Sequence, residues 1–123
     1  MAAAFVPDDL PKGTSTITAW AINTTTDMVV EANMFAKPDI PGFEQWALHT
    51  FAFLLHNPRL GRTVLFDSGS RKDWWNLPPA VVTRIKASTP RLKVERGVAE
   101  ILKNGGVDLE AIDDIVVSHW HWE

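Results

Sequence analysis

Two apolar runs separated by a short turn constrain the fold of this chain more than any other feature of its sequence. His49 to His56 is apolar throughout its middle, and a second run, Thr63 to Phe66, follows a turn at 57–61 that contains Asn, Pro and Gly. Runs of this length and spacing predict two neighbouring buried strands. The second run ends in Asp67-Ser68-Gly69, where glycine permits a sharp turn and aspartate can accept hydrogen bonds from nearby amides.

Two helices and another strand are expected after that turn. One helix follows Pro78 and Pro79, because proline suits a first helical turn. The second covers residues 94–104 and ends at a Gly-Gly pair, and its apolar face consists of Val94, Val98, Ile101 and Leu102. A short turn over 108–111 then leads into a buried strand, Asp114 to Ser118. Strands that lead into helices and back to a strand predict an α/β layered fold.

The N-terminal third predicts a β-hairpin. Residues 14–22 alternate small polar and apolar side chains, as a strand with one buried face does, and residues 23–27 form the turn. Residues 28–35 are the returning strand. The stretch 37–42 is a loop, because closely spaced prolines cannot sit in a paired ladder.

Composition narrows the possible functions. The 123 residues are 46% hydrophobic with a net charge of −3, which is typical of one globular domain and indicates no nucleic-acid partner. No stretch has the roughly 18 apolar residues of a membrane span. The N-terminus lacks a basic secretory signal, so we expect a cytoplasmic protein without a membrane partner. With no cysteine and four histidines, a metal would be held by His, Asp or Glu.

The residues that carry chemistry stand at the end of the chain, in Ser118-His119-Trp120-His121-Trp122-Glu123. If the strand continues in extended geometry, His119 and His121 point to one side and both tryptophans to the other. Two imidazoles can then face one Zn²⁺, which takes about four ligands in total. From this motif alone, exposed or hydrogen-bonded histidines remain the alternative interpretation.

The order of these features resembles the metallo-β-lactamase superfamily. The many tryptophans around the motifs of this chain look like those of a lactonase-like subgroup common in fungi. The matching pieces are Val64–Gly69, Ile115–Ser118 and His119–Glu123, with a Trp-rich segment at 71–79. The resemblance implies the N-terminal half of an αββα sandwich, with one mixed, mostly antiparallel sheet and helices on one face. The partial domain would cover residues 1–123. Within it, residues 1–13 would be an extended lead and residues 14–123 would form the half-sandwich.

By this resemblance His119 and His121 would be zinc ligands, while Asp67 would hydrogen-bond the metal-binding loop without being a ligand. The alternative for Asp67 is an acceptor in a strand-end turn. No motif position exists for His49 or His56, which are expected as strand-end residues. All six tryptophans are expected to be packing residues, with Trp120 and Trp122 behind the metal loop.

The chain also departs from the family pattern, because Glu123 stands where the family has Asp and the remaining ligands do not follow. We therefore expect a truncated half with an uncovered inner sheet face. A complete family domain would bind two zinc ions. This chain is expected to bind zinc weakly or not at all, and to be inactive alone. The complete domain would hydrolyse small-molecule lactones or esters. The alternatives are a non-catalytic α/β fragment that self-associates through its exposed sheet face, and a small binding module.

Overall fold

The computed structural model describes residues 13–119 and 121, and this part of the chain is an α/β fold, as the sequence predicts. The strands are β1 (Thr18–Asn23), β2 (Thr26–Glu31), β3 (Gln45–Leu48), β4 (Phe51–Asn57), β5 (Arg62–Phe66), β6 (Arg91–Val94) and β7 (Asp114–Val116). The α-helices are α1 (Pro79–Ser88) and α2 (Val98–Asn104), and short 3-10 helices cover Ala32–Met34, Trp74–Asn76 and Leu109–Ala111.

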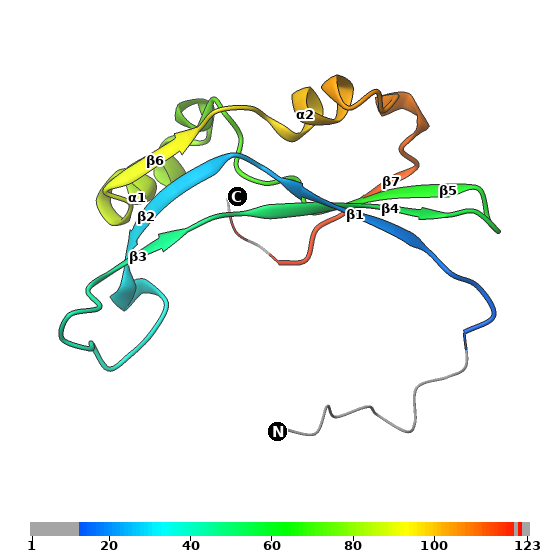
Figure 1. The fold of residues 1–123 in the computed structure, drawn as a ribbon. Helices are drawn as coiled ribbons and strands as arrows, with labels where there is room; N and C mark the ends of the chain where they lie inside the picture. The colour runs from blue at the N-terminus through cyan, green and yellow to red at the C-terminus, as the bar shows by residue number, and fades with distance from the viewer. Residues whose placement is uncertain (1–12, 120, 122–123) are drawn as a thin grey trace.

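The strands form two sheets where the sequence predicts one. The first has the order β1-β4-β5-β7 and the second the order β3-β2-β6. β7 runs parallel to β5, and every other pairing is antiparallel. β1 leads into β2 and β3 leads into β4 as two long bent ribbons, and both α-helices lie on one side of the strands (Figure 1). The two sheets are therefore joined through two continuous stretches of chain.

The expected hairpin between residues 14–22 and 28–35 is wrong. β1 pairs with β4, whereas β2 pairs with β3 and β6. The turn residues 23–25 bend the strand and do not reverse it, with Thr25 at φ +54°. The chain continues forward because Met28 and Val30 are buried in the second sheet, at 4% and 3% exposure.

Two other expectations differ from the structure in their boundaries. The helix expected over 94–104 begins at Val98, because Arg91–Val94 is strand β6 and Val94 is buried in the second sheet. Strand β3 has no counterpart in the sequence prediction. By contrast, the β4–β5 hairpin, the helix that starts at Pro79 and the Gly105-Gly106 helix end are confirmed.

The core lies between the first sheet and α2. Its buried members are Ile22, Ala52, Leu54, Leu65, Val98 and Leu102. Alternate residues of a strand point to opposite faces, so the other face of β4 carries Phe51 and Phe53. These side chains are 51% and 38% exposed. One face of the sheet is therefore covered by a helix, and the other is open and apolar.

Exposure corrects two further expectations. The strand expected to be buried at 114–118 is β7, an edge strand in which Ile115 is 62% exposed. Trp20 and Trp75 are exposed and not core residues, whereas Trp46 and Trp74 are half-buried. Trp120 and Trp122 lie outside the described residues. Within 13–119 and 121, neither helix is long and apolar enough to cross a bilayer.

Neighbouring residues of β4 test this assignment of faces. We expect Leu54→Ala to lower the free energy of unfolding by about 2–5 kcal/mol, because Leu54 packs under α2. Phe53→Ala should cost less than half as much although it removes a larger side chain, because Phe53 is on the open face. Urea denaturation measures both values. An equal or larger cost for Phe53→Ala would show that its face is covered in solution.

Candidate metal centre

Asp67 joins the end of β5 to the segment that follows β7. It directly follows β5 in the left-handed backbone region, at φ +58°. Its amide donates to the carbonyl of Val116 at 2.8 Å, and its Oδ1 accepts from the amide of Ser118 at 2.7 Å. One residue therefore satisfies two backbone groups of the segment that carries the histidines.

Gly69 lets the same loop pack against the bend between the two sheets. An added Cβ at this position would lie 2.5 Å from Cγ2 of Thr24, and φ is +63°. Thr24 is itself held at the bend, since its hydroxyl donates to the carbonyl of Thr50 at 2.8 Å and Thr50 donates to the hydroxyl of Thr26 at 2.9 Å. The absence of a side chain at Gly69 is what allows this approach.

The two histidine rings lie together, with centroids 4.7 Å apart and an interplanar angle of 74°. The expectation that the rings share one side is confirmed, but its geometric reason is wrong. Residues 117–119 and 121 are not extended strand, and the amide of His121 donates to the carbonyl of His119 at 3.2 Å. A tight bend therefore brings the rings together, where strand alternation was expected.

Neighbouring side chains orient both imidazoles. Ser118 Oγ and His119 Nδ1 are hydrogen-bonded at 2.7 Å. His121 meets the ring of Phe35 edge-on at 6.4 Å, and Phe35 stacks on Trp46 at 6.1 Å. Hydrogen bonds to the second ring nitrogen are the usual way in which a protein fixes the tautomer and orientation of a ligating histidine.

The donors present fit part of a metal site. Two adjacent imidazoles have the nitrogen chemistry that Zn²⁺ favours, but zinc takes about four ligands. Within residues 13–119 and 121, no group of three or more His, Asp and Glu side chains could hold a metal. Glu123, where the family pattern has Asp, lies outside the described residues. The two histidines could therefore supply two ligands to a metal, and the described residues do not supply the others.

The other two histidines have structural partners. His49 Nδ1 is 2.9 Å from the carbonyl of Thr26, and His56 Nδ1 is 3.0 Å from Oγ1 of Thr63. His56 lies inside β4, and His49 precedes it. Both fit the expected role near the ends of strands.

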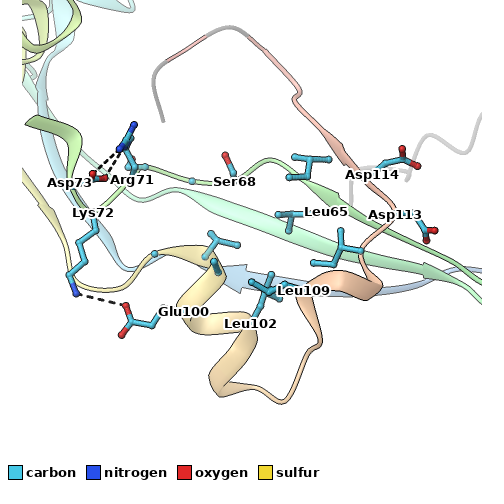
Figure 2. A pocket seen from close by; sticks show the side chains of 17 residues that line it. Leu65, Ser68, Arg71, Lys72, Asp73, Glu100, Leu102, Leu109, Asp113 and Asp114 are labelled. Carbon is cyan, nitrogen blue, oxygen red and sulfur yellow. Dashed lines mark hydrogen bonds and ion pairs between the residues drawn. The ribbon is translucent and has the colours of Figure 1, made fainter. Parts of the chain in front are cut away.

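A cavity of about 790 Å³ lies between α2 and the β5–β7 edge (Figure 2). Leu65, Leu102 and Leu109 line it, and neither His119 nor His121 does. At its rim Arg71 donates two hydrogen bonds to Asp73, at 2.8 and 2.7 Å, and these hold the pKa of the Asp73 carboxyl well below its usual range. This cavity is separate from the histidine pair.

A second cavity, of about 670 Å³, does include His121. Its other lining residues are Met34, Leu77, Ala80, Val81, Arg84 and Ser88. Sequence reasoning missed these residues because they come from α1, its preceding loop and the end of a 3-10 helix, none of which carries a motif. The one available signal was the helical spacing of Ala80, Arg84 and Ser88, which places them on one face of α1.

No family model matches this chain. It is 36% identical over 122 residues to gamma-lactamase FDB1 of Fusarium pseudograminearum (strain CS3096), which covers 95% of this chain and 30% of that protein. It is 29% identical over 117 residues to metallo-hydrolase mfmC of Annulohypoxylon moriforme, covering 93% of this chain and 30% of that protein. Cytochrome P450 monooxygenase mpaDE' of Penicillium brevicompactum is 32% identical over 119 residues, covering 94% of this chain and 14% of that protein.

Two of these relatives are named as a gamma-lactamase and a metallo-hydrolase. These relatives agree with the resemblance to the metallo-β-lactamase superfamily, as does the order of the Asp-x-Gly and His-x-His motifs. The chain spans less than a third of the length of these relatives.

Gly69→Ala tests the close approach to Thr24, and Gly61→Ala is a matched control. Both glycines have nearly the same left-handed φ, +63° and +61°, but nothing lies within 4 Å of an added Cβ at Gly61. We expect Gly61→Ala to cost about 1–2 kcal/mol of stability from backbone strain alone. Gly69→Ala should cost about 1–3 kcal/mol more, because the loop or Thr24 must shift. Equal losses in urea denaturation would exclude a contribution from this contact.

Asp67→Ala tests whether the carboxylate holds the histidine segment. Loss of the acceptor should speed hydrogen exchange at the Ser118 amide, measured by NMR under native conditions. Asp67→Asn keeps a side-chain oxygen and tolerates the left-handed backbone, so most of the protection should remain. Unchanged exchange in Asp67→Ala would show that other contacts hold the segment.

Proposed function

We propose that this chain forms part of a zinc-dependent hydrolase of cyclic amides or esters, in which His119 and His121 hold the metal. The observation that carries the proposal is the pair of imidazole rings 4.7 Å apart on a segment anchored by Asp67. Imidazole nitrogens suit zinc, and the sequence has no cysteine to compete as a ligand.

Each nearby residue has a defined part in this proposal. Asp67 fixes the backbone of the loop through Ser118, and the Ser118 hydroxyl orients the ring of His119. Zinc held by the two rings would polarise a substrate carbonyl and make water a better nucleophile. The exposed position of both histidines leaves the site open to a small molecule.

The substrate class comes from two sources. One relative is named a gamma-lactamase, and a γ-lactam is a cyclic amide. The lactonase-like resemblance points to cyclic esters, whose hydrolysis also begins with attack on a carbonyl. Because both reactions need the same activated water and polarised carbonyl, we assign the chain to this shared class.

The described residues supply two of the roughly four ligands of zinc, so we expect weak binding and no hydrolysis by this chain alone. A second candidate is a non-catalytic fragment that associates through its open sheet face. The exposed Phe51 and Phe53 favour this candidate, because apolar patches commonly mark interaction surfaces. A cytoplasmic location stays a prediction.

A zinc titration followed by NMR tests the metal assignment. We expect the imidazole signals of His119 and His121 to shift in a saturable manner, because they ligate the metal together. Signals of His49 and His56 should not move, since each ring is engaged within the strands. Replacement of either His119 or His121 by alanine should abolish the response of the other ring.

His49→Ala is the control, and it should leave the zinc response intact. Equal shifts at all four histidines, or none, would contradict the metal assignment and leave the non-catalytic fragment as the better description. Tight stoichiometric binding by the unmodified chain would contradict the claim that further ligands are needed.

A further inference from the structure

Among the described residues, the cavity that includes His121 has one fixed positive charge in its wall. Its volume of about 670 Å³ is within the range of ordinary small-molecule sites, roughly 300–1,000 Å³. Met34, Leu77, Ala80 and Val81 make most of its lining apolar. Arg84 is the one Lys, Arg, Asp or Glu side chain among the described lining residues.

The structure gives Arg84 no acidic partner among the described residues. The ion pairs of this part of the chain use other cations, Arg62, Arg71, Lys72 and Arg91. The hydrogen bond between Ser88 Oγ and the Arg84 carbonyl, 2.8 Å long, uses the backbone and not the guanidinium. The guanidinium can therefore pair with an anion that enters the cavity.

We propose that Arg84 binds the substrate, and that the substrate is a cyclic amide or ester with an apolar body and a carboxylate remote from the scissile bond. This inference rests on the proposed function, because it places the scissile carbonyl at the His119 and His121 end of the cavity. Arginine offers two parallel N–H donors that match a carboxylate. Met34, Leu77 and Val81 contact the apolar body between these two ends.

Helix α1 provides an internal comparison. Lys86 lies two residues from Arg84 on the same helix and is exposed, but it does not line the cavity. A general attraction of anions to a positively charged helix would depend on both residues. A defined site in the cavity depends on Arg84 alone.

The test uses the full chain in chelator-treated, metal-free buffer at low ionic strength, with benzoate as the probe and benzamide as its neutral counterpart. Binding is followed by NMR chemical-shift titration. We expect benzoate to bind more tightly than benzamide, with shifts at residues of α1 and at Met34. Arg84→Gln should weaken benzoate binding about three- to fivefold, as expected for an exposed ion pair. It should leave benzamide binding unchanged.

Lys86→Gln should leave benzoate binding within experimental error, and Arg84→Lys should retain part of it. All these side chains are exposed, so thermal unfolding should confirm that each variant remains folded. Equal loss in Lys86→Gln and Arg84→Gln, equal binding of benzoate and benzamide, or shifts away from α1 would each overturn the assignment.

The metal titration separates this inference from the proposed function. A benzoate response without a zinc response at His119 and His121 supports an anion site at Arg84 and overturns the hydrolase. A zinc response without preference for benzoate supports the metal site and overturns the role of Arg84.

Discussion

The two hydrogen bonds of Asp67 connect parts of the chain that are about fifty residues apart. β5 and β7 are parallel neighbours, and parallel strands need a crossover between them, here α1, β6 and α2. The ends of such strands meet at one edge of the sheet. Asp67 uses this proximity to hold both Val116 and Ser118, so the position of the histidine pair depends on it.

The bend between the two sheets supports the same loop from the other side. Thr24, Thr26 and Thr50 are joined by hydrogen bonds where β1 passes into β2 and where β4 begins. Gly69 packs against Thr24 there. Buried hydroxyls need partners, and this cluster provides them within itself. The loop at 67–70 is thus placed between a polar bend and the end of β7.

The two faces of the first sheet have different roles. One face holds the core with α2, while the other exposes Phe51 and Phe53. The cavities also differ: the larger one lies beneath α2, and the one lined by α1 includes His121. Of these two cavities, the second combines a candidate metal ligand, His121, with a cation, Arg84, that has no acidic partner among the described residues.

Local signals in the sequence determined the β4–β5 hairpin and the start of α1 at Pro79, whereas the link between Asp67 and the two histidines came from the family resemblance. The hairpin and the helix start each depend on a short apolar run or a turn residue, so neighbouring residues suffice to define them. The same local reasoning failed at 14–35 and at 94–104. There the chain could form a hairpin or a longer helix, and the choice depended on distant partners.

Only the tertiary structure decided those cases, because burial of Met28, Val30 and Val94 in a second sheet outweighs local preference. It also decided that a bend, in place of an extended strand, brings His119 and His121 together. Arg84 joined the site for the same reason. A side chain without a motif becomes functional only when folding places it in the wall of a shared cavity, and spacing along the chain does not encode that proximity.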